Sequence, residues 1–236
     1  MPSTRPRVTV VQNFAGAPLN RFAGWLSDVE VRTVRAFAGE VLPAAAGEGL
    51  LVLGGRMNAY ADDVAPWLPA TRRLIADSVA ADVPVLGICL GHQLLAVATG
   101  GEVTVGTPED REAGLVDVTW NPAAAADPVL GGVAGGSTSS YQYAMHTDGV
   151  TRLPPDAVHL AGSARYPVQA LRVGSAVGVQ FHPEASPAVV ERWAEGNGSR
   201  GMPSVEAAVR AEHDDDVARV GRTIAGNFAA AVRDAA

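Results

Sequence analysis

Short apolar runs alternate with segments of helical periodicity over the first hundred residues of the chain. Four runs are either continuously apolar or alternate with the two-residue period of a strand, and they cover residues 7–12, 29–34, 50–53 and 83–88. Apolar residues at helical spacing predict helices over residues 18–27, 66–80 and 90–99. Strands that alternate with helices in this way predict a parallel sheet with helices on both of its faces.

From Gly101 onward the pattern changes to short β-rich segments that are separated by clusters of proline and glycine. Strands are predicted over residues 102–105, 115–120, 141–144, 157–161, 168–173 and 176–181. The lack of intervening helices indicates that this half of the sheet is mostly antiparallel or mixed. Two further helices are predicted over residues 187–195 and about 203–234. The glycine-rich connector 196–201 is expected to be a surface loop, and its alternative role is a lid or partner contact.

Length and composition exclude several functional classes. The 236 residues suit one α/β domain over residues 1–236, with a C-terminal helical extension from about residue 187. A net charge of −7 gives no electrostatic footprint for nucleic acid, and no apolar run is long enough to span a membrane. All basic residues are arginine, which excludes a lysine Schiff base and a Walker-type phosphate loop. With one cysteine and no predicted secretion signal, we expect a cytoplasmic protein that binds no nucleic acid and no membrane.

Cys89, the only cysteine of the chain, follows the predicted strand 83–88. It has a glycine two residues away on each side, in the sequence Gly87-Ile88-Cys89-Leu90-Gly91. This spacing is the thiol form of the nucleophile elbow, a tight strand-to-helix turn that leaves no room for larger side chains at the two glycines. The turn lifts the sulfur clear of the sheet edge at a helix N-terminus, which favours a reactive thiolate. The alternative, a buried apolar cysteine, is disfavoured by the two glycines.

Two further segments are expected at the same edge of the sheet. Gly54-Gly55 follow the apolar run 50–53, and ligands bind at the carboxyl ends of parallel strands. The last predicted strand is followed by His182-Pro183-Glu184. In extended backbone, residues two apart point to the same side, so Glu184 can hydrogen-bond the His182 ring and fix its tautomer. A capped turn is the alternative reading of that tripeptide, but an elbow cysteine in the same chain favours a catalytic base and its orienting carboxylate.

These segments resemble the class I (triad) glutamine amidotransferases. The resemblance rests on Gly87-Ile88-Cys89-Leu90-Gly91-His92-Gln93 and on Gln180-Phe181-His182-Pro183-Glu184, and it extends over most of residues 8–186. It includes Leu51-Val52-Leu53-Gly54-Gly55, which is similar to the oxyanion loop of the family, and His146-Thr147-Asp148. Within this family, the chain resembles free-standing bacterial relatives of the amidotransferase domain of GMP synthase. The resemblance implies a three-layer α/β fold with a flavodoxin-like mixed sheet and helices on both faces.

The resemblance also implies a role for each matching position. Cys89 is expected to attack the side-chain amide of glutamine, His182 to carry protons to the departing ammonia, and Glu184 to orient His182. The loop of Gly54 and the backbone amides of Gly55 and Leu90 are expected to hold the oxyanion. The amino-acid end of glutamine is expected to contact residues Gln93, His146 and Thr147.

The sequence departs from the family pattern in two places. Arg56 stands where the family usually has proline, and it adds a cation near the site. Thr147 stands where similar proteins often have serine or glycine. We interpret His92 as structural, packing behind the elbow. The run Asp214-Asp215-Asp216 is interpreted as a solvated helix face.

Three functional hypotheses remain open at the level of sequence. The first is a glutaminase that uses a cysteine thioester and supplies ammonia to a separate synthase partner. The second is a hydrolase of γ-glutamyl amides or peptides. Arg56 favours this hypothesis because its positive charge suits a larger anionic substrate. The third is a non-catalytic binding or regulatory protein on the same fold. No metal and no cofactor are expected, and the sequence leaves open the nitrogen acceptor and the oligomeric state.

Overall fold

The computed structural model describes residues 5–196 and 207–236 of the chain. Within this part, nine strands form one mixed sheet in the order β2-β1-β3-β4-β11-β10-β9-β6-β7. The bounds of these strands are β1 Arg7–Gln12, β2 Glu30–Arg35, β3 Gly49–Val52, β4 Val85–Ile88, β6 Glu112–Trp120, β7 Ser139–His146, β9 Val158–Gly162, β10 Ala170–Val173 and β11 Ala176–Val179. Strands β2, β1, β3, β4 and β11 are mutually parallel, and the remaining pairs are antiparallel. The predicted change from parallel to antiparallel pairing is confirmed.

The central strands are buried on both faces, as continuous apolar runs predict. In β3, Leu50 and Val52 belong to one core cluster and Leu51 belongs to the other. Successive side chains of a strand point to opposite faces, so each face needs its own layer of helices. The α/β fold class with helices on both faces is confirmed.

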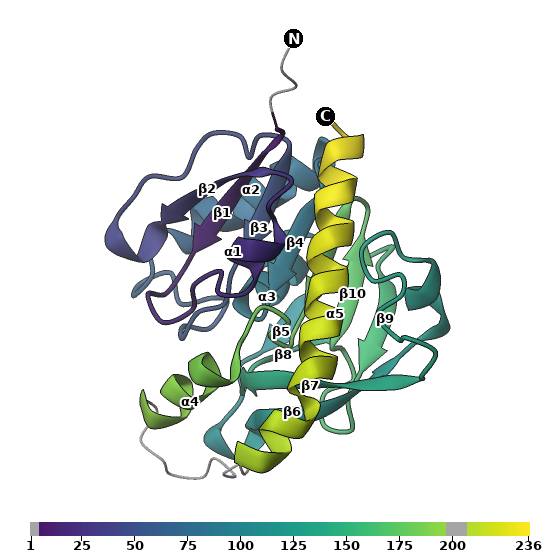
Figure 1. Cartoon of the computed structure of the whole chain (residues 1–236). Coiled ribbons are helices and arrows are strands. Elements are labelled where there is room, and N and C mark those ends of the chain that lie inside the picture. The colour runs from purple at the N-terminus through teal and green to yellow at the C-terminus, as the bar shows by residue number, and fades with distance from the viewer. Residues whose placement is uncertain (1–4, 197–206) are drawn as a thin grey trace.

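Helices α2 (Leu68–Ala80) and α3 (Leu90–Ala98) cover one face. The short helix α1 (Phe22–Trp25) and the long helix α5 (Ala207–Asp234) cover the other face, and Figure 1 shows α5 running along the molecule in front of the sheet. Ile224 and Phe228 of α5 are completely buried beside Phe22. The C-terminal helix therefore contributes a layer of the core. Helix α4 (Pro187–Gly196) lies beside the carboxyl end of the parallel strands.

Several elements differ from the sequence prediction. The predicted helix 18–27 contains only one helical turn, α1. The segment predicted as a strand at 102–105 is β5 (Glu102–Thr104), which pairs with β8 (Gly149–Arg152) in a separate two-stranded sheet of the described chain. Strand β8 was not predicted, because its half-exposed sequence Gly-Val-Thr-Arg carries a single buried apolar side chain. Short 3-10 helices cover Ala36–Ala38, Pro108–Asp110 and Pro122–Ala126.

The aspartate run at the start of α5 is more than a solvated face. Asp214 accepts a 2.6 Å hydrogen bond from Arg21 and a 3.2 Å bond from the Tyr143 hydroxyl. Asp216 pairs with Arg219, and Asp215 is exposed as predicted. The prediction was wrong for Asp214 because its partner Arg21 lies in a loop nearly two hundred residues earlier. No local sequence pattern indicates a contact between residues so far apart. The predicted connector 196–201 lies, except for Gly196, outside the described residues.

No described helix combines the length and the apolar character needed to cross a lipid bilayer. The described residues also contain no group of three or more histidine, cysteine, aspartate or glutamate side chains arranged to hold a metal ion.

Candidate active site

Cys89 occupies the turn between β4 and α3, and its backbone is strained. Its φ of 52° and ψ of −105° lie outside the regions that a side chain normally adopts. Such a conformation costs about 1–3 kcal/mol and persists only where the surroundings fix it. The amide of Cys89 donates to the Val179 carbonyl at 2.8 Å, and the Gln93 amide donates to the Cys89 carbonyl at 3.1 Å. The cysteine is thus held between the end of β11 and the first turn of α3.

The two glycines of the elbow are required by close backbone contacts. A Cβ atom on Gly91 would lie 2.0 Å from the carbonyl oxygen of Val52, and one on Gly87 would lie 2.5 Å from the carbonyl oxygen of Gly91. Both distances are far inside van der Waals contact. The spacing of glycines around Cys89 therefore permits α3 to start directly against the central strands, as the elbow pattern predicts.

His182 and Glu184 form the hydrogen bond that their sequence spacing predicts. Nδ1 of His182 lies 2.8 Å from Oε1 of Glu184, and both side chains are at least 95% buried. The His182 amide donates to the Tyr143 carbonyl at 2.7 Å, which fixes the backbone at this point. The His182 ring also packs against the ring of Trp193 on α4, with 4.5 Å between ring centroids.

The electrostatic environment of His182 favours the protonated ring. Burial lowers the pKa of His182, but the charges of Glu184 and Cys89 and the hydrogen bonds to both residues outweigh it and raise the pKa to about 10. The His182 ring and Cys89 both lie beside Gly54, and Glu184 forms a hydrogen bond with Nδ1 of the ring. A histidine placed in this way can give a proton to a leaving group and stabilise a thiolate.

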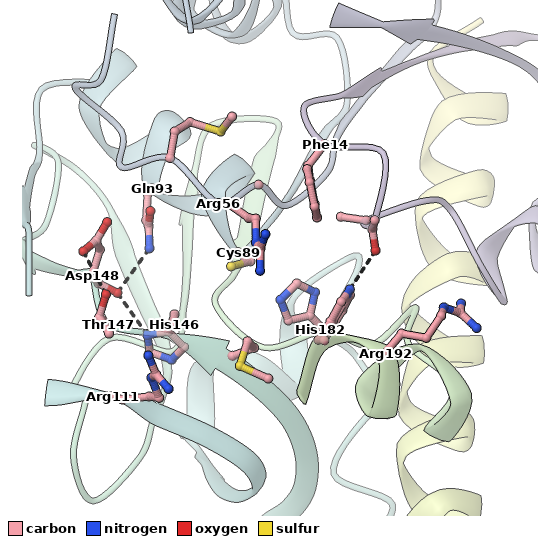
Figure 2. A pocket seen from close by; sticks show the side chains of 16 residues that line it. Phe14, Arg56, Cys89, Gln93, Arg111, His146, Thr147, Asp148, His182 and Arg192 are labelled. Carbon is pink, nitrogen blue, oxygen red and sulfur yellow. Dashed lines mark hydrogen bonds between the residues drawn. The ribbon is translucent and has the colours of Figure 1, made fainter. Parts of the chain in front are cut away.

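Cys89 and His182 open onto one cavity of about 390 Å³. Figure 2 shows the Cys89 sulfur near its centre, with Gln93, His146 and Thr147 on one side and His182 and Arg192 on the other. Of the predicted site residues, Cys89, His182, Gly55, Gln93, His146 and Thr147 line this cavity. The structure thus brings together predicted residues that are separated by more than one hundred positions.

Gly54 and Gly55 follow β3 and lie beside the elbow. A Cβ atom on Gly54 would be 3.0 Å from Cε1 of His182 and 3.6 Å from Cβ of Cys89. A Cβ atom on Gly55 would be 2.7 Å from the Leu90 side chain. The loop therefore packs closely against Cys89, His182 and Leu90, and a side chain at either glycine would have to displace a neighbouring side chain. Backbone amides in such a loop and at the start of α3 are the kind of donors that stabilise an oxyanion.

The glycine loop is held by Asn13, a residue that no sequence motif marks. Asn13 Nδ2 donates to the Leu53 carbonyl at 2.8 Å, and Trp67 Nε1 donates to Asn13 Oδ1 at 3.0 Å. Asn13 directly follows the buried strand β1 and is itself completely buried. A polar residue at the carboxyl end of a parallel strand was the signal that could have identified it.

Gln93 and the segment 146–148 meet on the opposite side of the sulfur from His182. Gln93 Nε2 donates to the Asp148 carbonyl and to Gln180 Oε1, each at 3.1 Å. Thr147 accepts a 2.5 Å hydrogen bond on its carbonyl oxygen from the Tyr166 hydroxyl. The Gln93 amide nitrogen is thus engaged in bracing this wall of the cavity, and its side chain still faces the cavity.

Three arginines and two aromatic residues line the cavity in addition to the predicted residues. They are Arg56, Arg111, Arg192, Phe14 and Trp193. The Arg56 guanidinium lies 5.2 Å from the centroid of the Phe14 ring, a cation–π contact between two lining residues. Only Arg56 was singled out from the sequence, because the others have no motif. Asp148 contributes the cavity's one lining carboxylate among the described residues.

His92 is completely buried and is not among the residues that line the cavity in the described chain. Burial lowers its pKa to about 3, so the ring is neutral. A Cβ atom on Gly178 of β11 would lie 2.6 Å from Nδ1 of His92, which places the ring behind the elbow. The structure agrees with the structural interpretation of His92.

Comparisons with known proteins agree with this geometry. The family model described as "Glutamine amidotransferase class-I" matches residues 20–192. A segment of 103 residues is 46% identical to a protein of Sulfurisphaera tokodaii named as a subunit of glutamine-hydrolyzing GMP synthase, and it covers 43% of this chain and 50% of that protein. A segment of 149 residues, 61% of this chain, is 35% identical to 25% of the glutamine-hydrolyzing GMP synthase of Synechococcus sp.. The chain therefore matches about half of the length of the GMP synthase subunits to which it is similar.

A solved structure covers nearly the whole chain. The glutamine amidotransferase from Methylobacillus flagellatus superposes with a TM-score of 0.81 at 29% identity, over 99% of this chain and 96% of its own. The fold, the nucleophile elbow and the family match are thus consistent with one another. The chain belongs to the class-I glutamine amidotransferase family.

Proposed function

We propose that this chain is a glutaminase that hydrolyses the side-chain amide of glutamine through a thioester on Cys89. The observation that supports it best is the joint placement of Cys89 and His182 at one cavity, with Glu184 at 2.8 Å from His182. This placement supports a mechanism in which His182 carries the proton for the Cys89 nucleophile and Glu184 orients His182. The remaining predicted residues are assigned to the binding of substrate and oxyanion.

The reaction divides into acylation and deacylation. The Cys89 thiolate attacks the amide carbon of glutamine, and the amides of Gly55 and Leu90 hold the negative oxygen of the tetrahedral intermediate. His182 gives its proton to the amide nitrogen, the carbon–nitrogen bond breaks, and ammonia leaves. A water molecule then gives a proton to His182 and attacks the thioester carbon. The carbon–sulfur bond breaks, and glutamate leaves with Cys89 restored as a thiolate.

We further propose that glutamine lies with its amino-acid end towards Gln93, His146 and Thr147. These residues line the side of the cavity that faces away from His182 (Figure 2). Ammonia would then leave on the His182 side, where the proton is supplied. Two relatives are named as one subunit of a GMP synthase, so we propose that a separate synthase subunit receives the ammonia.

Ammonia release from glutamine tests the proposal. The purified chain should release ammonia and glutamate in equal amounts, and Cys89→Ala should abolish release. If the wild type releases no ammonia and a glutamine-mimicking electrophile does not label Cys89, the chain is a binding protein and the proposal is wrong. Capture of a synthase subunit from the source cell would identify the acceptor chemistry.

The charge of the cavity favours a second candidate, the hydrolysis of γ-glutamyl amides that carry an anionic group. Glutamine is a zwitterion without net charge, whereas the cavity is lined by Arg56, Arg111 and Arg192 against Asp148. Arg192 lies on the His182 side, where the leaving amine would emerge (Figure 2). Under this candidate, γ-glutamylglycine is hydrolysed faster than γ-glutamylmethylamide, and Arg192→Gln removes the difference. Equal rates for both amides in the wild type would exclude this candidate.

A further inference from the structure

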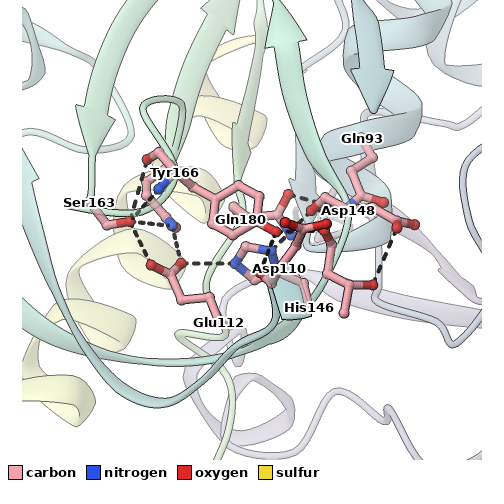
Figure 3. A network of polar contacts seen from close by, with 10 residues as sticks. Gln93, Asp110, Glu112, His146, Asp148, Ser163, Tyr166 and Gln180 are labelled. Carbon is pink, nitrogen blue, oxygen red and sulfur yellow. Dashed lines mark hydrogen bonds and ion pairs between the residues drawn. The ribbon is translucent and has the colours of Figure 1, made fainter. Parts of the chain in front are cut away.

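A second histidine–carboxylate pair is buried in the wall of the cavity, on the side away from His182. Nε2 of His146 lies 3.0 Å from Oε2 of Glu112, and the two side chains are 2% and 8% exposed. Glu112 begins β6 and His146 ends β7, where they are direct partners in the antiparallel register. Figure 3 shows this pair within a network of polar contacts that extends to Gln93 and Asp148.

Glu112 is surrounded by donors. The Ser163 hydroxyl donates to Oε1 at 2.6 Å, and Gln169 Nε2 donates to Oε2 at 2.5 Å. Burial raises the pKa of Glu112, but the hydrogen bonds from His146, Ser163 and Gln169 and the charge of His146 outweigh it and hold the pKa below its usual value. Glu112 is therefore an ionised carboxylate at neutral pH. Burial of such a charge is costly unless each of its oxygens is paired, as it is here.

The other nitrogen of His146 continues the network towards the nucleophile. Nδ1 lies 3.0 Å from the carbonyl oxygen of Asp148, and a carbonyl oxygen can only accept, so Nδ1 donates. Gln93 donates to the same carbonyl oxygen at 3.1 Å. Gln93 lies in the first turn of α3, four residues after Cys89. One chain of contacts thus connects Glu112 to the helix that presents the sulfur.

The segment 146–148 is fixed by three more contacts. The Tyr166 hydroxyl donates to the Thr147 carbonyl at 2.5 Å, and its ring meets the His146 ring with 4.5 Å between centroids. Burial and the nearby carboxylates of Asp110 and Glu112 raise the pKa of Tyr166 to about 12, so the phenol remains a donor. The Gly106 amide donates to Asp148 Oδ1 at 3.0 Å. Every residue of the segment is therefore held, and His146 is held through Glu112.

We propose that Glu112 is a positioning residue for the amino-acid end of glutamine. It holds the His146 ring, and through Asp148 and Gln93 it sets the distance between the wall 146–148 and Cys89. Glu112 lies outside the lining of the cavity and touches no reacting atom. This inference rests on the proposed glutaminase function, and it assigns Glu112 to substrate binding. Loss of a residue that supports ground state and transition state equally raises KM and leaves kcat unchanged.

Two covalent probes separate positioning from general damage. Iodoacetamide reports the reactivity of the Cys89 sulfur alone, and 6-diazo-5-oxo-L-norleucine also needs the site for the amino-acid end. In Glu112→Gln, one amide oxygen replaces two carboxylate oxygens that accept three hydrogen bonds. We expect the labelling rate with the diazoketone to fall about tenfold and that with iodoacetamide to change less than twofold. The KM for glutamine should rise about tenfold at nearly constant kcat.

Asp127→Asn is the matched control. Asp127 is a buried carboxylate paired with Arg172 and with the amides of Val129 and Leu130, and it does not line the cavity. Its substitution should lower the thermal midpoint without changing the ratio of the two labelling rates. Ser163→Ala removes one hydrogen bond that Glu112 accepts and should change that ratio about two- to threefold. This variant replaces Glu112→Gln in the test if Glu112→Gln does not fold.

The outcomes distinguish the inference from the function on which it rests. The positioning role alone is overturned if the wild-type chain reacts with the diazoketone but Glu112→Gln leaves the ratio of the two labelling rates unchanged. Parallel loss of both labelling rates in Glu112→Gln, as general damage would cause, also overturns it. A wild-type chain that reacts with iodoacetamide but not with the diazoketone overturns the glutaminase function and the positioning role together.

Discussion

Substitution of Gly91 by alanine tests the packing that presents Cys89. The new Cβ atom would lie 2.0 Å from the Val52 carbonyl oxygen, whereas ordinary contact begins at 3.4 Å. The start of α3 or the end of β3 must therefore move by about 1.4 Å, the difference between those distances. Val52 belongs to a fully buried central strand, so the movement must occur at the elbow or disrupt the sheet.

The magnitude follows from the two effects of that movement. Overpacking costs about 1–3 kcal/mol and more where backbone must shift, so we expect a loss of about 3 kcal/mol. For a chain of this size, this lowers the thermal midpoint by about 6–12 °C. Misplacement of catalytic groups by about 1 Å can reduce the rate about 100-fold. We therefore expect kcat/KM for glutamine to fall at least about 100-fold.

Gly226→Ala provides the control in the same chain. Gly226 is an exposed residue within α5, and a Cβ atom there would meet nothing within 4 Å. Alanine in place of glycine in a helix should raise stability by about 0.5–1 kcal/mol and leave activity unchanged. Thermal unfolding followed by circular dichroism and an ammonia-release assay measure both variants. A Gly91→Ala variant with wild-type stability and activity would refute the close approach of α3 to β3.

The remaining predictions concern the two buried carboxylates with the clearest partners. Glu184→Gln should reduce kcat about 100-fold or more, because His182 loses the group that orients it and supports its charge. The pKa of His182 is raised from 6.5 to about 10, so the stability from this pair is complete below pH about 6.5 and is lost as pH rises through about 10. The difference in thermal midpoint between wild type and Glu184→Gln should therefore shrink between pH about 7 and 10, and a constant difference would contradict the pairing. Burial raises the pKa of Asp127, but Arg172 and the amides of Val129 and Leu130 hold it below the usual 3.8. The stability that Asp127 supplies is thus present above pH about 3.8 and is lost as pH falls through its lowered folded pKa. Asp127→Asn should cost about 3 kcal/mol at neutral pH, measured by denaturant unfolding, because it leaves Arg172 unpaired and largely buried, and the KM for glutamine should not change.

The sequence predicts the parallel half of the fold well because each central strand is a continuous apolar run that can be recognised from its own residues. Residues 50–53 and 83–88 are apolar runs that end in glycine or cysteine, and the observed strands β3 and β4 lie within one residue or two of the predicted bounds. The elbow was also visible, since two glycines at fixed spacing reflect local crowding that the structure shows at Gly87 and Gly91.

Contacts between segments that are distant in the chain leave no comparable pattern in the sequence. The ion pair of Arg21 with Asp214 joins residues far apart in sequence, and neither residue lies in a motif. Glu112 is one acidic residue among many, and only the pairing of β6 with β7 places it against His146. Asn13 is an intermediate case. Its position after a buried strand indicates a residue near the site, but the sequence does not indicate its hydrogen bond to the Leu53 carbonyl.

The most direct test of the central claim is the mass of the Cys89 peptide after glutamine and the protein are mixed and quenched in acid. We predict a mass increase of one γ-glutamyl group on Cys89 in the wild type. The increase should be absent in Cys89→Ala, which should also release no ammonia. Steady consumption of glutamine by Cys89→Ala at the wild-type rate would contradict the claim that this sulfur carries the reaction.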